Sequence, residues 1–156
     1  MAAIGIADTT FSRVNMGRIA EDTIRESGEQ HRLVRYTVPG VKDLPVAAKR
    51  LFAEHGCDIV VACGMVGHEA VDKACGHEAS TAIQQVQLMV DRHVLEVFVH
   101  MDEAEDDADL LLLATNRTRK HALNALALLK GPTSLTPLAG TGRRQGRNDV
   151  GGIPDK

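Results

Sequence analysis

A loop at residues 39–43 carries the residues of this 156-residue chain best suited to bind a ligand. Pro39 and Gly40 end an apolar run, and Pro45 suits the first turn of a following helix. Lys42 and Asp43 lie at the start of that helix, where unpaired backbone N–H groups can bind a small polar molecule. Taken alone, Asp43 is more simply interpreted as structural, because acidic residues are favoured near helix N-termini.

Two other loops offer a surface for a flat ligand. Phe11 follows a short apolar run in a chain with only 3% aromatic residues, so it is either a stacking platform or a plug of the core. Gly64 and Gly67 bracket a loop in which the backbone can approach a ligand closely, or in which the turn simply needs glycine. The full glycine fingerprints of dinucleotide and phosphate loops are absent, which argues against NAD binding.

A polar cluster opens the long helix that follows. It places Lys73 and His77 four residues apart on one face, where a neutral His77 could act as a general base, although a solvated helix face is the simpler interpretation. The spacing of the histidines does not fit a zinc site. The acidic run 102–109 could attract Mg²⁺ or complement a helix dipole. A basic patch on the last helix is interpreted as solvated, or as reaching a neighbouring subunit: Arg117, Arg119, Lys120 and His121.

Apolar periodicity predicts strands and helices in strict alternation. Strands are expected at residues 2–7, 31–38, 58–63 and 93–99, and helices at 15–27, 44–55, 69–90 and 110–129. This order predicts a small four-stranded parallel sheet in a three-layer α/β/α domain, residues 1–130, followed by a Gly/Arg/Pro-rich tail, 131–156, without regular structure. Ligands of such sheets bind beyond the carboxyl ends of the strands.

Composition narrows the range of partners. A net charge of −3 argues against nucleic acid or an anionic membrane as the main partner, and no apolar run reaches membrane length. Asp8 comes too early for the apolar part of a signal peptide, and three cysteines without CxxC spacing favour a reducing compartment, so a cytoplasmic protein is expected. The leucine-rich run 110–113 leaves apolar surface for a partner, which predicts a homo-oligomer.

Several segments together resemble the lumazine synthase family, most closely its archaeal-type riboflavin synthase branch. The resemblance covers residues 1 to about 130, with further similarity in the tail. Asp8-Thr9-Thr10-Phe11 and Val38-Pro39-Gly40-Val41-Lys42-Asp43-Leu44-Pro45 are its strongest motifs. The other motifs are Gly56-Cys57-Asp58-Ile59-Val60, His77-Glu78-Ala79-Ser80, Glu96-Val97-Phe98-Val99-His100 and, in the tail, residues 139–146.

This resemblance implies a flavodoxin-like, lumazine-synthase-like fold and a site between adjacent subunits of a pentamer. Phe11 would stack on the pyrimidine ring, while Val41, Lys42 and Asp43 would hold the ring and the ribityl chain. The full implied set of substrate-binding residues is Thr10, Phe11, Gly40, Val41, Lys42, Asp43, Cys63, Gly64, Met65, His68 and Glu69. Lys42, Asp43 and Glu69 would orient the substrate, and His77 is the candidate base.

Two departures from lumazine synthases point to the riboflavin synthase branch. Val71 stands where lumazine synthases have a catalytic histidine, and Asp109-Leu110-Leu111 stands where they have a phosphate-binding arginine. The expected reaction moves a four-carbon unit between two molecules of 6,7-dimethyl-8-ribityllumazine, giving riboflavin and 5-amino-6-(ribitylamino)pyrimidinedione. It needs no redox cofactor, and the branch implies Mg²⁺ as an aid to activity. The alternatives are 6,7-dimethyl-8-ribityllumazine synthase itself and a non-catalytic flavin- or pterin-binding protein.

Overall fold

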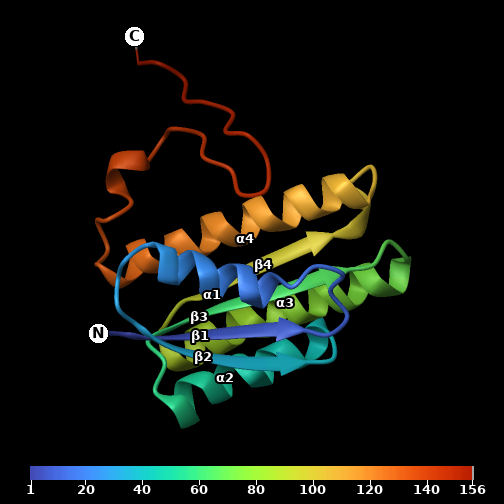
Figure 1. The fold of residues 1–156 in the computed structure, drawn as a ribbon, viewed down its shortest axis with the longest axis horizontal. Coiled ribbons are helices and arrows are strands. Elements are labelled where there is room, and N and C mark those ends of the chain that lie inside the picture. The colour runs from blue at the N-terminus through green and yellow to red at the C-terminus, as the bar shows by residue number, and fades with distance from the viewer. Residues whose placement is uncertain (156) are drawn as a thin grey trace.

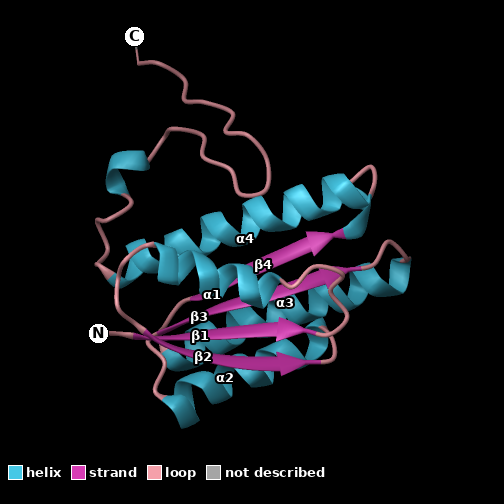
Figure 2. Cartoon of the chain, viewed as in Figure 1, coloured by secondary structure: helices cyan, strands magenta, loops and turns pink. Residues whose placement is uncertain are grey.

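A computed structural model describes residues 1–155 as a parallel sheet between two layers of helices (Figures 1 and 2). The strands are β1 (Ala3–Thr9), β2 (Arg32–Val38), β3 (Ile59–Val66) and β4 (Val94–His100), in the order β2-β1-β3-β4. Every pairing in this order is parallel. The predicted three-layer, four-stranded fold is therefore confirmed, and β2 and β4 form its edges.

The helices pack in pairs on the two faces of the sheet. They are α1 (Met16–Glu26), α2 (Leu44–His55), α3 (Ala70–Val90) and α4 (Asp107–Leu129), with short 3₁₀ turns at Val41–Asp43, Met101–Glu103 and Thr136–Leu138. One core lies under α1 and α4, and the other lies under α2 and α3. Strand β3 is buried on both sides, since Val61 and Met65 face the first core while Val60 and Val66 face the second. None of the helices in residues 1–155 is long and apolar enough to span a bilayer.

Three element boundaries differ from the sequence prediction by two residues or more. Strand β1 continues to Thr9 rather than ending at residue 7, because Asp8 and Thr9 still pair with β2. The segment Gly64 to Val66 was expected to be a loop, but it continues β3 because it pairs with β4 as far as Val66 opposite His100. Helix α4 begins at Asp107 rather than at residue 110, since the side chain of Asp106 accepts a hydrogen bond from the backbone of Asp109 (2.8 Å) and caps it. Part of the acidic run is thus the first turn of this helix.

Two glycines let neighbouring elements approach β3 closely. A Cβ atom added to Gly64 would lie 2.7 Å from the Val41 side chain, and one added to Gly76 of α3 would lie 2.9 Å from Val66. Such distances are shorter than packed carbon atoms tolerate. Glycine at these two positions therefore allows the loop before α2 and the start of α3 to lie directly on the sheet.

The tail after α4 folds back along that helix. Lys120 donates hydrogen bonds to the carbonyl oxygens of Arg144 (2.9 Å) and Arg147 (3.2 Å), and the backbone of Gly146 donates to Asn116 (2.8 Å). Apart from the Thr136–Leu138 turn, the tail has the irregular backbone that its composition predicts. Its contacts with α4 were not predicted. Lys156, the last residue of the predicted tail, lies outside the described residues.

Candidate active site

A cavity of about 250 Å³ opens at the carboxyl ends of β1, β2 and β3, where a ligand of such a sheet is expected. We call it the loop cavity. It brings together six of the predicted substrate-binding residues: Phe11, Gly40, Val41, Lys42, Asp43 and Met65. It also contains Gly67, a glycine at which the sequence allowed the backbone to approach a ligand. Three further lining residues were not assigned to the site from the sequence: Val66, Asp72 and Cys75.

Phe11 stands at the rim of the loop cavity rather than in the core. Its residue surface is 51% exposed, so the alternative of a core plug is wrong. The backbone of Phe11 donates a hydrogen bond to the carbonyl of Pro39 (3.1 Å), and Thr10 bonds to Val38 (2.9 Å) and Pro39 (3.3 Å). Thr10 therefore joins the first two loops, without lining the cavity itself.

The charged residues of the second loop have different partners. Lys42 forms an ion pair with Glu78 of α3 (2.8 Å), which raises the pKa of the lysine and lowers the pKa of the glutamate. This pair connects the loop to α3. Asp43 precedes α2, but its side chain makes no capping hydrogen bond to the helix. Asp43 therefore does not cap α2 through its side chain, and its carboxylate is exposed at the cavity. Its position just before α2 also fits a favourable interaction with the helix dipole.

Four other predicted residues lie outside the loop cavity. Cys63 and Gly64 are inside β3, and burial of the Cys63 thiol in the core raises its pKa. His68 and Glu69 are exposed at the start of α3, where Glu69 and Asp72 form a capping box (Glu69 N to Asp72 Oδ2, 3.2 Å). Neither His68 nor Glu69 lines the loop cavity, where their contact with the substrate was predicted.

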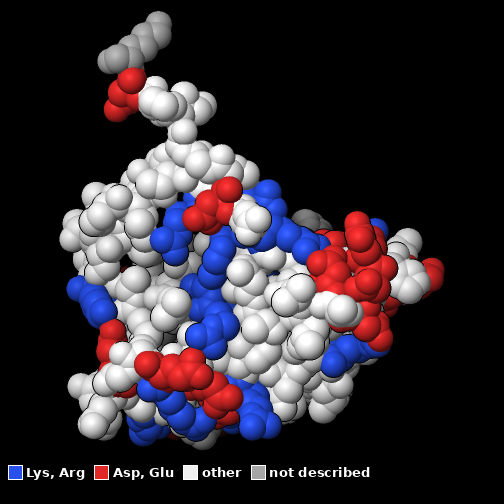
Figure 3. Space-filling view, turned by 45° about the horizontal axis from the view of Figure 1, so that its top comes forward, with Lys and Arg blue, Asp and Glu red and all other residues white. Residues whose placement is uncertain are grey.

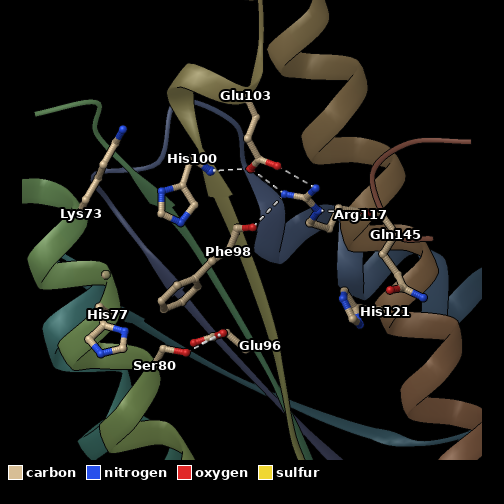
Figure 4. A pocket seen from close by; sticks show the side chains of 11 residues that line it. Lys73, His77, Ser80, Glu96, Phe98, His100, Glu103, Arg117, His121 and Gln145 are labelled. Atoms are coloured by element: carbon tan, nitrogen blue, oxygen red, sulfur yellow. Dashed lines mark hydrogen bonds and ion pairs between the residues drawn. The ribbon is translucent and has the colours of Figure 1, made fainter.

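A second cavity, of about 470 Å³, lies beside edge strand β4 between α3 and α4 (Figure 4). We call it the edge cavity. His77, the candidate base, lines this cavity and not the loop cavity. The first turns of α3 separate the two, with Asp72 and Cys75 on the loop side and His77 on the edge side. Its lining residues are Lys73, Gly76, His77, Ser80, Glu96, Phe98, His100, Glu103, Arg117, His121 and Gln145.

Most residues of the edge cavity were not assigned to a site from the sequence, although signals for them exist. Glu96, Phe98 and His100 alternate along β4, and a period of two places such side chains on one face of a strand. Together with Ser80 and Gln145, they also fall in motifs that carry the family resemblance. The basic patch was expected to be solvated, but the Arg117 side chain is only 16% exposed.

Arg117 organises the upper end of the edge cavity. Its guanidinium donates to both carboxylate oxygens of Glu103 (2.8 and 3.0 Å) and to the carbonyls of Phe98 and Gln145 (both 3.0 Å). Burial and the neighbouring guanidinium lower the pKa of His121 to about 4, so this histidine is uncharged at neutral pH. The cavity therefore combines the Arg117–Glu103 ion pair with the uncharged ring of His121.

Glu96 and Lys73, two other ionisable residues of the edge cavity, each interact with one polar side chain. Ser80 donates a hydrogen bond to Glu96 (2.9 Å), and burial raises the pKa of that carboxyl. Lys73 was predicted to be the cation next to His77 on one face of the helix. In the structure its ammonium forms an ion pair with Asp102 (2.5 Å).

The acidic run 102–109 does not form a preorganised metal site. Its carboxylates pair with separate cations, as in Asp107 with Arg13 (2.8 Å) and Asp109 with Arg147 (2.7 Å). Figure 3 shows acidic side chains gathered at one end of the face, with basic side chains next to them. Across residues 1–155, no group of three or more His, Cys, Asp or Glu side chains is arranged to hold a metal ion.

Comparison with known proteins gives matches along nearly the whole chain. The profile of the 6,7-dimethyl-8-ribityllumazine synthase family matches residues 2–132. The riboflavin synthase of Methanothermobacter marburgensis is 52% identical over 151 residues, covering 97% of this chain and 99% of that protein. The riboflavin synthase of Archaeoglobus fulgidus is 53% identical over 150 residues, covering 96% and 97%. That of Aeropyrum pernix is 46% identical over 151 residues, covering 96% and 97%.

Proposed function

Because the chain belongs to the 6,7-dimethyl-8-ribityllumazine synthase family, we infer that it is a riboflavin synthase of that family. The enzyme transfers a four-carbon unit from one molecule of 6,7-dimethyl-8-ribityllumazine to a second. One molecule becomes riboflavin, and the other becomes 5-amino-6-(ribitylamino)pyrimidinedione. Atoms and electrons balance between the two lumazines, so the proposed reaction requires no oxidant or redox cofactor.

The pairing of the cations is the structural observation that favours this activity over lumazine synthase. A lumazine synthase must bind a four-carbon phosphate, for which a free Arg or Lys is the usual ligand. Each Lys or Arg that lines the two cavities of the described chain already has a carboxylate partner: Lys42 with Glu78, Lys73 with Asp102, and Arg117 with Glu103. Asp109, at the position of the family's phosphate arginine, is itself paired with Arg147.

We assign the roles in the site by geometry. Phe11, half exposed at the rim of the loop cavity, would stack on one heterocycle, and Asp43 would accept hydrogen bonds from its polar edge. His77 would remove a proton from the acidic C7 methyl group of a lumazine. Holding two flat rings together replaces a bimolecular encounter, which accounts for most of the expected rate enhancement.

A pentameric assembly is part of the proposal. Helix α3 separates His77 from the loop cavity within one chain, so a site that uses both cavities needs two copies. Large apolar side chains on α3 and α4 are also exposed, including Leu88 (84%), Met89 (68%) and Leu112 (69%). We propose a homopentamer located in the cytoplasm. We also propose that Mg²⁺ increases turnover. No step is assigned to it, because no three His, Cys, Asp or Glu side chains of the described residues are arranged to hold a metal ion.

The deciding experiment supplies 6,7-dimethyl-8-ribityllumazine as the only organic substrate at neutral pH. We expect riboflavin and the ribitylamino-pyrimidinedione in equal amounts, with faster turnover when Mg²⁺ is added than when EDTA is present. Product that appears only with the pyrimidine and a four-carbon phosphate together would identify a lumazine synthase. Tight binding of the lumazine without its consumption would identify a non-catalytic binding protein.

A further inference from the structure

The edge cavity contains two buried polar atoms that lack hydrogen-bond partners. Within residues 1–155 three buried side-chain atoms are unpaired, and two of them, Glu96 Oε1 and His121 Nδ1, belong to residues that line this cavity. An unpaired buried polar group costs roughly 1–3 kcal/mol. Two such atoms beside one cavity indicate that a polar ligand supplies the missing hydrogen bonds.

Ser80 holds the Glu96 carboxyl in one orientation. The serine hydroxyl donates to Glu96 Oε2 (2.9 Å), which leaves Oε1 as the unpaired oxygen. Figure 4 shows that Ser80 comes from α3 and Glu96 from β4, with the Phe98 ring next to both. Phe98 is two residues further along β4, so its side chain lies on the same face of the strand.

The volume of the edge cavity suits a small heterocycle. About 470 Å³ lies within the range of roughly 300–1,000 Å³ that is common for small-molecule sites. The aromatic ring offers an apolar face, and the carboxyl oxygen offers an acceptor beside it. A planar ligand with an N–H group on its edge satisfies both.

We propose that Glu96, positioned by Ser80, determines specificity in the edge cavity by accepting a hydrogen bond from the imide N–H of a pyrimidinedione ring that packs against Phe98. The ligand class is ribitylated pyrimidinediones, in which this N–H lies between two carbonyl groups. The assignment rests on the proposed function, whose substrate and both products share the imide. Removing the acceptor therefore weakens binding of every ligand that carries the N–H.

The test compares riboflavin with its N3-methyl derivative, which lacks the imide proton. Binding is measured by calorimetry for the wild type, Glu96→Ala, Glu96→Gln and Ser80→Ala. The matched control is Glu54→Gln, on the exposed surface of α2. For Glu96→Ala we expect the dissociation constant for riboflavin to rise about tenfold or more, as for a lost hydrogen bond to a charged group. The dissociation constant for N3-methylriboflavin should be the same in variant and wild type.

Two results would overturn the proposal. One is equal weakening for both flavins, which would mean that Glu96 acts only through the fold or on another part of the ligand. The other is unchanged riboflavin affinity with an altered sedimentation coefficient, which would mean that a second copy of the chain fills the cavity. Because riboflavin is not consumed, this experiment is independent of turnover. Glu96→Ala could weaken the binding of riboflavin but not of N3-methylriboflavin, while the wild type fails to consume the lumazine. That result would support the role of Glu96 and reject the synthase activity.

Discussion

Phe11 is the residue proposed to stack on the substrate in the loop cavity. Because its ring is half exposed, Phe11→Ala should weaken substrate binding by about 1–3 kcal/mol, by analogy with base stacking, and leave stability nearly unchanged. Phe52 of α2 is the matched control, since it is 5% exposed and its removal should cost about 3–5 kcal/mol of folding free energy. Substrate titration and thermal melting of both variants distinguish the two roles. A large loss of melting temperature in Phe11→Ala with normal affinity would place Phe11 in the core.

His121 should make stability dependent on pH in a defined window. Its pKa is about 4 in the folded chain and about 6.5 when unfolded, so between these values the unfolded state binds more protons. Stability should therefore fall as the pH drops from 6.5 to 4, by up to about 3 kcal/mol from this group. In His121→Gln this part of the loss should disappear, whereas His93→Gln, on the surface, should behave as wild type. Identical pH profiles for wild type and His121→Gln would contradict the buried, uncharged state.

The two cavities show what residue patterns can and cannot predict. Phe11 and residues 40–43 of the loop cavity were predictable because they directly follow β1 and β2, and the ends of parallel strands meet at one edge. The other lining residues, such as Asp72 and Cys75 on α3, do not follow a strand. The edge cavity combines Ser80, Glu96, Arg117 and Gln145, which come from α3, β4, α4 and the tail. No short spacing relates these segments, so only their packing brings the side chains together. For Glu96, Phe98 and His100 the local signal was their alternation along β4, which an ordinary edge strand also shows.

At the scale of elements, the sequence predicted the type and order of every strand and long helix, and it missed the ends of β1 and β3 and the start of α4. Glycine is rare inside strands, so Gly64 suggested a loop, but pairing with β4 overrides that preference. The start of α4 was missed because acidic residues fit both a solvated loop and a first helical turn. Strand pairing and helix capping determine such boundaries, and they cannot be read from composition alone.

The attachment of the tail to α4 gives a prediction for this element. Arg147 bonds to Asp109 (2.7 Å) and to the carbonyl of Glu103 (2.7 Å), so Arg147→Gln should release the preceding residues. Trypsin should then cut after Arg143 and Arg144 several-fold faster than in wild type, because cleavage follows local opening. Arg119→Gln, which removes a surface ion pair with Glu26, is the control. Mass spectrometry of the fragments gives the rates, and equal rates in all three proteins would show that Arg147 does not hold the tail.

The assembly of the whole molecule is tested by its mass in solution. Sedimentation should give a species about five times the 16.8 kDa chain, and a monomer at micromolar concentration would contradict the pentamer. Leu88→Glu places a charge on the most exposed large apolar residue of α3 and should shift the equilibrium toward smaller species. Gln85→Glu adds the same charge to an exposed polar position of that helix and should leave the mass unchanged. If both variants sediment as wild type, this face of α3 is not part of the interface.

The hydrogen bonds of Arg117 and Glu103 also protect the rim of the sheet. Strand β4 is an edge, and a free edge offers backbone groups to which a foreign strand can add. Here the carbonyl of Phe98 accepts from Arg117 (3.0 Å), and the amide of His100 donates to Glu103 (2.9 Å). These side chains occupy the same backbone groups that a misfolded copy would use as a template. The carboxyl end of β4 is thereby guarded against aggregation by strand addition.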